Sequence, residues 1–375
     1  IITAPIPRWE GGIAGRLRNK RADIATHLRQ AIVQGHLRAG QRVQTRDELA
    51  NHFRVSSNTV QAALARLTQE GFLNSKRKAG TFVSPTPPNL CNFAVVFSDS
   101  PSNDRAKWSR YYATLCNQIM ASQDSFAPRQ IELHYGVTPH ADNEGFLDLC
   151  RLVREHRIAA LLFPMPPTQF ENTPLLDEPG IARVMPGPRM KGLDIPTVLL
   201  DTQSFMTEAS SRLASSGLRR PAVLMPPGFP LPPCTEDAEL RQMAHDMFYR
   251  AGHHLKPAWV QLPDPRKPEA IRAMIELLFA GSDCPDSLIL ADDHYFAPAS
   301  AALSTIPDVF RPKLVVAYQN FPAPELHCPV AVAALGFDSR KLIRGMVALA
   351  DAQIAGEQVS GITVEAQFAE DISHS

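Results

Sequence analysis

Residues 24–83 read IATHLRQAIVQGHLRAGQRVQTRDELANHFRVSSNTVQAALARLTQEGFLNSKRKAGTFV, and this stretch carries the clearest structural pattern of the chain. Apolar residues at helical spacing, closed by a glycine, predict a first helix over 23–35. Thr45 followed by Glu48 has the spacing of a capping box and predicts a second helix over 45–53. After a short turn a third helix is predicted over 57–70, with Ser56 as its N-cap. Two helices joined by so short a turn are typical of a helix-turn-helix.

A basic loop between two short apolar strands follows the third helix. Phe72 and Leu73 precede the loop 74–80, and residues 81–83 follow it, which predicts the wing of a winged helix. The segment SPTPPN, residues 84–89, then predicts a stiff, extended linker. We therefore expect a basic leader over 1–22, a winged helix over 23–84 and a linker over 85–91.

The charge of the chain is divided unevenly about Pro85. Residues 1–85 carry 14 Lys and Arg against 5 Asp and Glu, a net charge of +9, and the remaining residues carry −9. A small basic module beside a larger acidic one suggests that the first meets a polyanion and the second has another task.

Residues 92–375 change to apolar runs of strand length that alternate with helical segments. The expected strands are 93–97, 131–135, 159–163, 197–201, 222–225, 288–292 and 313–318. Helices are expected over 143–156, 236–251, 269–280 and 339–355. Most of the strands are apolar throughout, as in parallel sheets covered on both faces. The pattern predicts an α/β domain of two lobes with doubly wound parallel sheets.

Composition and motifs exclude several classes of protein. No apolar run approaches the roughly 18 to 20 residues that span a bilayer, and the first residues are too polar for an export signal, so a cytoplasmic location is expected. The six cysteines form no CxxC pair, which indicates reduced thiols and no metal site. Neither GxSxG, HExxH, a Walker motif nor GxGxxG occurs. We expect no enzyme activity and no cofactor.

The first domain resembles the GntR family of bacterial winged-helix regulators. The family frame I-x-x-x-L-R-x-x-I-x-x-G-x-L-x-x-G is matched by Ile24, Leu28, Arg29, Ile32, Gly35, Leu37 and Gly40. The resemblance covers about 60 residues and implies binding to double-stranded operator DNA through a recognition helix in the major groove.

The resemblance places DNA contacts on the second and third helices and in the wing. The predicted contact residues are Arg46, Ser56, Ser57, Asn58, Thr59, Gln61, Lys76, Arg77, Lys78 and Gly80. The family usually has arginines where this chain has Ser57 and Gln61. Asn58 and Gln61 could instead pair with adenine in bidentate fashion, or simply solvate the face of a helix.

The remainder is similar to the LacI/GalR type of effector domain, the fold of periplasmic sugar-binding proteins. The stretch PDSLILADDHYFAPASAAL, residues 285–303, carries the likeness, together with residues 218–225, Arg241 and the closing 336–357. The two halves together resemble the arabinose-repressor arrangement, a GntR-type head on a LacI-type body. This resemblance implies a small-molecule effector of the sugar or sugar-derivative class.

The resemblance implies an effector site formed by five residues. Asp293 would accept hydrogen bonds from ligand hydroxyls, and Arg241 would donate to hydroxyl or carboxylate oxygens. Asp99, Trp108 and Tyr111 follow the first strand of the domain, where an aromatic ring can stack on a sugar. The alternative is a structural role: a surface salt bridge or helix cap for Asp293 and Arg241, and core packing for Trp108. Where the family usually has Gly-Tyr-Asp, residues 317–319 of this chain are Ala-Tyr-Gln.

These observations predict a homodimeric repressor that binds a palindromic operator and responds to a small ligand bound between the lobes. Ligand closure would move the linker and change the spacing of the two heads. Two alternatives remain: a GntR-type head on an aminotransferase-like body holding pyridoxal phosphate, and a DNA-binding protein whose large domain serves only for dimerisation.

Overall fold

The computed structural model describes residues 20–101, 109–227, 237–358 and 361–372. The longer helices are α1 Lys20–Val33, α2 Arg46–Phe53, α3 Ser57–Gln69, α5 Arg110–Ala121, α6 Glu144–Arg154, α8 Thr202–Ser215, α9 Asp237–Arg250, α10 Pro268–Leu278, α11 Phe296–Thr305 and α12 Ser339–Ile354. The short helices are α4 Pro88–Cys91, α7 Pro174–Asp177, α13 Ala369–Ile372 and the 3-10 turns η1 Gln123–Phe126, η2 Thr168–Phe170, η3 Pro257–Trp259 and η4 Asp308–Phe310.

The strands form a two-stranded ribbon and two six-stranded sheets. They are β1 Leu73–Lys76, β2 Gly80–Val83, β3 Asn92–Val96, β4 Gln130–His134, β5 Ala160–Leu162, β6 Ala182–Pro186, β7 Thr197–Asp201, β8 Pro221–Leu224, β9 Val260–Gln261, β10 Ser287–Leu290, β11 Leu314–Phe321, β12 Ala331–Asp338, β13 Ile362–Glu365 and β14 Gln367–Phe368. The strand orders are β13-β7-β6-β5-β3-β4 and β14-β12-β11-β10-β8-β9.

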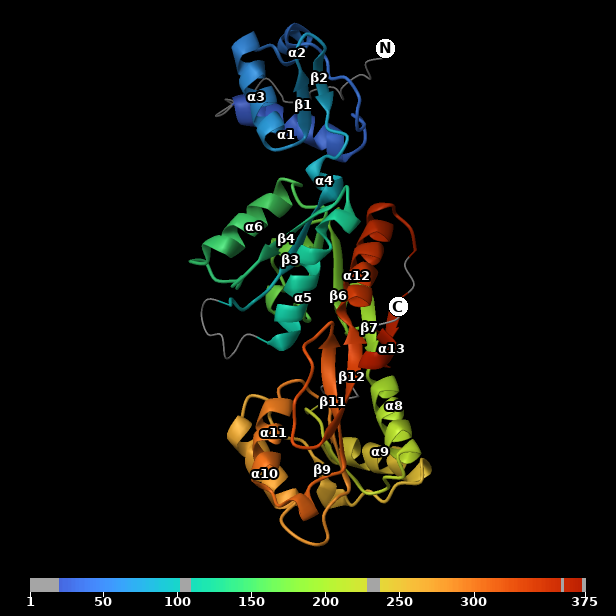
Figure 1. The fold of residues 1–375 in the computed structure, drawn as a ribbon. Coiled ribbons are helices and arrows are strands. Elements are labelled where there is room, and N and C mark those ends of the chain that lie inside the picture. Colours follow the sequence, from blue (N-terminus) through green and yellow to red (C-terminus); the bar gives the residue numbers. More distant parts are fainter. Residues whose placement is uncertain (1–19, 102–108, 228–236, 359–360, 373–375) are drawn as a thin grey trace. The chain divides into compact units, whose positions relative to one another are not determined.

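The N-terminal elements form a winged helix around its own core (Figure 1). Leu28 of α1, Leu49 of α2, and Val60 and Leu67 of α3 are almost completely buried, together with Phe72 after α3. These are apolar positions at helical spacing, so burying one face of each helix determines how the three pack. The wing is the antiparallel pair β1–β2. The predicted helix-turn-helix and wing are confirmed.

Two details of this region differ from the expectation. Helix α1 begins at Lys20, inside the segment predicted as a leader, whose residues 1–19 lie outside the described part. The segment 84–89, predicted as a stiff, extended linker, is not extended throughout. The Ser84 N–H donates to the Phe72 carbonyl at 2.8 Å, Pro87 and Pro88 are buried, and α4 begins at Pro88. Proline is well suited to the first turn of a helix, which explains why this segment turns instead of continuing extended.

The two larger sheets are built almost entirely from parallel strands. In the sheet that contains β10, the antiparallel pair is β12–β14, and the other pairs are parallel. All seven expected strands are present, with ends that differ from the expected ones by at most three residues, and so are the four expected helices. The apolar runs are buried on both faces, which requires helices on both sides of each sheet. The predicted doubly wound α/β architecture is confirmed.

The chain divides into two compact units by its internal contacts. The first comprises residues up to 101 together with 122–184 and 350–359, and the second comprises 102–121, 185–349 and 360–375. The first unit therefore holds the winged helix and β3, β4 and β5, whereas the second holds α5, both helices α8 and α9, and the whole of the β10-containing sheet.

The five described cysteines are all free thiols, three of them buried. Within the described residues, no helix is both long and apolar enough to cross a membrane.

Candidate nucleic-acid interface and ligand cavity

The turn between α2 and α3 is fixed by caps at both of its ends. The Thr45 hydroxyl accepts from the Glu48 N–H while the Glu48 carboxylate accepts from the Thr45 N–H, which completes the predicted capping box. Helix α2 ends at Arg54, which has a left-handed backbone with φ of 53°, and Ser56 then caps α3. These caps satisfy backbone groups that a helix end leaves unpaired, so the two helices meet at a defined angle.

The predicted contact residues of α2 and α3 fall into two groups. Ser57 donates to the Asp47 carboxylate at 3.0 Å, and the hydroxyls of Ser56 and Thr59 lie 2.8 Å apart. These three side chains hold the turn together. Arg46, Asn58 and Gln61 are instead exposed, and they are the polar side chains that this end of the motif presents to solvent. Such side chains are those that reach base edges and phosphates in helix-turn-helix proteins.

The wing presents a row of exposed cations. Lys76, Arg77 and Lys78 are all exposed, and the Lys76 ammonium lies 5.5 Å from the centre of the Phe82 ring. Gly80 has a φ of 108°, and a side chain there would meet the Arg42 guanidinium at 3.0 Å. The glycine therefore allows Arg42 to lie across the base of the wing.

Arg42 is a residue that the sequence argument missed. It forms an isolated antiparallel bridge with Phe82, which adds a third short segment to the wing. The available signal was the sequence GQRV between the first glycine turn and the capping box. The sequence alone does not show that this segment lies beside the wing, because the contact forms only when the chain folds back on itself.

The second unit contains a cavity of about 600 Å³ with a largely polar set of side chains. It lies between α5, the loop and helix that follow β10, and the end of β11. The lining residues are Arg110, Ala113, Thr114, Asn117, Asp293, Phe296, Ala297, Ser300, Gln319, Asn320, Ala323, Pro324, Glu325, Leu326 and His327. Concave sites of this size with a few convergent polar groups typically bind small molecules.

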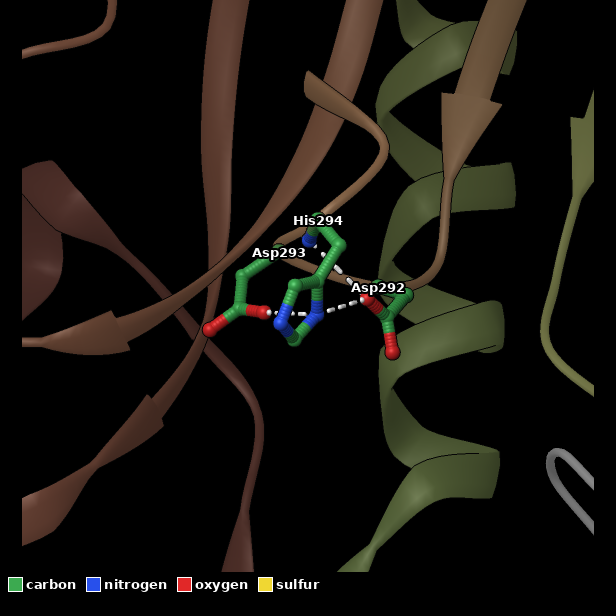
Figure 2. Close-up of side chains that lie close together, drawn as sticks. All are labelled: Asp292, Asp293 and His294. Carbon is green, nitrogen blue, oxygen red and sulfur yellow. Dashed lines mark hydrogen bonds and ion pairs between the residues drawn. The ribbon is translucent and has the colours of Figure 1, made fainter. Parts of the chain in front are cut away.

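Asp293 lies at the wall of this cavity and is 7% exposed. One of its carboxylate oxygens accepts from the Asn320 amide at 3.2 Å, and the other lies 2.9 Å from His294 Nδ1. The same ring nitrogen lies 2.8 Å from a carboxylate oxygen of Asp292 (Figure 2). Since each carboxylate oxygen has more than one lone pair, Asp293 can still accept a hydrogen bond from a ligand hydroxyl.

Hydrogen bonds to Asp292 and Asp293 raise the pKa of His294 to about 10, against the opposing effect of burial. The ring is therefore protonated at neutral pH. Burial also raises the pKa of Tyr318 well above its usual value, and its hydroxyl donates to Asn320 at 3.2 Å. The polar wall of the cavity is thus held by side chains that support one another.

The other predicted effector residues lie in different places. Arg241 is on α9 and its guanidinium donates to the Val260 carbonyl; it is not among the cavity's lining residues. Tyr111 is on α5, where burial raises its pKa, and it follows the cavity residue Arg110. Asp99 is exposed after β3 in the first unit, and Trp108 lies outside the described residues. The structure brings Asp293 and the helix of Tyr111 together at one cavity.

Several cavity residues were not identified as site residues from the sequence. Asn117 and Thr114 come from α5, which the sequence argument did not predict, and Asn320 comes from the end of β11. A signal for Asn320 was present in the sequence YQNF, where polar residues end an apolar strand. Side chains at the carboxyl ends of parallel strands gather at the ligand-binding edge of a sheet.

Known proteins resemble the N-terminal part and the α/β part of the chain separately. Residues 20–83 match the model of the bacterial regulatory proteins of the gntR family. The arabinose metabolism transcriptional repressor of Geobacillus stearothermophilus is 39% identical over 57 residues, 15% of this chain and 16% of that protein. The mannosyl-D-glycerate transport/metabolism system repressor MngR of Escherichia coli (strain K12) is 29% identical over 110 residues, 29% of this chain and 45% of that protein. The chain thus spans less than half the length of these curated relatives.

Solved structures resemble a much larger part of the chain. A LacI family transcriptional regulator from Mycobacterium smegmatis has a TM-score of 0.51 at 17% identity, covering 74% of this chain and 96% of that one. The transcriptional regulator CelR in complex with cellobiose has a TM-score of 0.52 at 19% identity, covering 85% and 92%. Residues 20–83 are a gntR-family helix-turn-helix domain, and the α/β part has the fold of LacI-family regulators. The aminotransferase-like alternative is not favoured.

Proposed function

We propose that this chain is a bacterial transcription regulator, acting as a repressor, whose affinity for operator DNA is controlled by a small ligand. The observation that carries the proposal is the combination in one chain of a gntR-type winged helix and a LacI-type α/β body with a polar cavity. The curated relatives are named as repressors of sugar-metabolism systems, which supports the same role. A regulator of this kind works in the cytoplasm, where bacterial DNA is.

In this proposal α3 enters the major groove with Asn58 and Gln61 facing the DNA. Arg46, at the start of α2, also faces the DNA. The exposed cations of the wing contact the phosphate backbone, where they add affinity without sequence preference. The protein acts as a homodimer, so its operator is palindromic, with half-sites separated by one or more helical turns.

The ligand occupies the cavity beside Asp293 and is a sugar or sugar derivative. A carboxylate acceptor and three side-chain amides provide hydrogen-bond partners for hydroxyls, and Phe296 provides an apolar ring for a carbon face. A related fold holding cellobiose supports this class of ligand. Contributions from Asp99, Trp108, Tyr111 and Arg241 remain predictions.

Thermal unfolding against a panel of neutral sugars, sugar acids and sugar phosphates tests the ligand. At 100 times its dissociation constant, a ligand adds about 2.7 kcal/mol of stability. The shift should disappear in Asp293→Asn and persist in Asp308→Asn, an exposed aspartate of the same unit. DNA selected from a random pool should then lose affinity when the ligand is added. A panel without any hit would favour a body that serves for assembly alone.

A further inference from the structure

Three consecutive side chains converge immediately after β10. The His294 N–H donates to Asp292 Oδ1 at 2.9 Å, which folds the loop so that the imidazole lies between the two carboxylates (Figure 2). Its Nδ1 then lies 2.8 Å from Asp292 Oδ1 and 2.9 Å from Asp293 Oδ1. One ring nitrogen thus contacts both acids.

This arrangement favours a positive charge at the ring. Two carboxylates close to the same nitrogen repel each other, and Asp293 is largely shielded from the water that would solvate its charge. A buried carboxylate without a cation nearby tends to take up a proton and lose its capacity as an acceptor. An imidazolium between the two acids compensates both charges and leaves Asp293 ionised.

The same three side chains come near enough together to hold a metal ion, but their spacing fits a shared proton better. Ligand atoms around a tetrahedral zinc, with bonds of 2.0–2.1 Å, lie about 3.3 Å apart. The nitrogen-to-oxygen distances of 2.8 and 2.9 Å are those of direct charge-assisted hydrogen bonds.

We propose that His294 is a positioning residue that, as an imidazolium shared by Asp292 and Asp293, holds Asp293 ionised and oriented as the hydroxyl acceptor of the cavity. This rests on the proposed function, because it assigns a role toward the ligand of that site. Asn320, on the neighbouring parallel strand β11, donates to the other carboxylate oxygen, so the acceptor is held from two sides.

The proposal makes ligand affinity depend on pH in a defined direction. Affinity is full while His294 is protonated and falls as pH rises through the pKa of about 10. Other ionisable groups are also present on the elements around the ring and the cavity. They are Arg110 and Tyr111 on α5, Tyr295 and Asp264 behind the loop, Tyr318 on β11, and Glu325 and His327 at the cavity rim.

Histidine NMR titration of the full chain tests the charge without any ligand. The carbon-bound ring proton resonance that disappears in His294→Asn should titrate near pH 10. His245→Asn, which changes a half-buried histidine beside Asp246, is the assignment control and should leave that resonance in place. Asp292→Asn should lower the His294 midpoint while keeping the fold. A His294 midpoint near the ordinary 6.5 would overturn the proposal.

Binding of a hit from the sugar panel provides the second arm. His294→Asn should weaken it about tenfold or more at pH 7.5, and His245→Asn should leave it within about twofold. Equal binding by the wild type and His294→Asn would overturn the positioning role. Zinc added alone, if it bound tightly and released the His294 proton, would overturn the shared-proton assignment. A panel with no hit would count against the proposed function, while the NMR result would still decide the charge of His294.

Discussion

Gln61 projects from the exposed face of α3 one turn beyond the N-cap. Its amide has a donor and an acceptor, the pair needed for bidentate contact with adenine, which is worth about 1–3 kcal/mol of base discrimination. Gln61→Ala should weaken binding to the selected operator by that amount and relax preference at one base pair. The change is measured by fluorescence anisotropy on operators varied at single positions.

Gln69→Ala provides the matched control for this prediction. Gln69 is also exposed on α3 but lies at its last residue, away from the capped end. Its substitution should leave DNA affinity unchanged. If both variants lost affinity equally, or if Gln61→Ala weakened binding to every sequence alike, the assigned base contact would be wrong.

His253 shows how burial of a single ring affects stability. It is 1% exposed, its Nε2 lies 3.1 Å from the Ser210 carbonyl and hydroxyl, and burial lowers its pKa. The folded protein therefore holds the ring neutral, whereas the unfolded chain binds a proton below about pH 6.5. Stability from this residue is present above that pH and is lost as pH falls through it.

The variant His253→Gln should accordingly be less stable at pH 7.5 but lose less of its stability between pH 7 and pH 5 than the wild type. Urea unfolding at several pH values measures this slope. The adjacent exposed His254, changed to Gln, should retain the wild-type slope. Parallel slopes for all three proteins would show that His253 is not held neutral.

At the scale of elements, β11 and β12 determine the shape of the cavity wall. The strands are paired in parallel with Gln319 opposite Gly336. A Cβ atom at position 336 would overlap the carbonyl oxygen of Gln319 and would lie 2.8 Å from the carbonyl carbon of that residue. The glycine therefore allows β12 to approach the strand that carries Gln319 and Asn320.

Gly336→Ala should destabilise the α/β body by about 1–3 kcal/mol or more, because backbone has to shift to relieve the overlap. It should also reduce ligand binding, since β11 moves with its side chains. Gly281→Ala, which meets nothing within 4 Å, is the control. Thermal unfolding with and without ligand measures both effects, and a variant as stable as the control would contradict the close approach.

At the scale of the whole molecule, an ion pair connects the winged helix to the α/β body within the first unit. Arg66 of α3 is held by Glu70 at 2.6 Å and also reaches Glu155, at the end of α6, at 3.0 Å. Glu70 in turn pairs with Arg29 of α1 at 2.6 Å. Because Glu70 already orients Arg66, less side-chain entropy is lost when Arg66 meets Glu155.

A double-mutant cycle with Arg66→Gln and Glu155→Gln should give a coupling of about 0.2–1 kcal/mol that decreases with salt. Asp148→Asn, on the same helix and paired with Arg151, should show no coupling to Arg66. Hydrogen exchange across residues 84–92 should increase in Glu155→Gln. Zero coupling together with unchanged exchange would mean that the winged helix does not use this contact.

Local patterns determined much of this protein. The helical spacing of 24–83, the capping box at Thr45 and the basic turn at Lys76 were sufficient for the winged helix, because those signals act between residues close in sequence. Apolar runs likewise predicted seven parallel strands. Asp293 could be selected because it follows such a run directly.

Tertiary structure decided the rest. The strands β6, β9, β12, β13 and β14 and the helices α5, α8 and α11 carry weaker local patterns and form because neighbouring strands and helices provide their partners. Asn320 contacts Asp293, Arg42 lies beside Gly80, and Arg241 donates to the Val260 carbonyl. These residues are far apart in the sequence, so the periodicity of the sequence does not predict their contacts. Short-range order follows from propensity and caps, whereas side chains far apart in the sequence meet only when burial of the core brings their strands together.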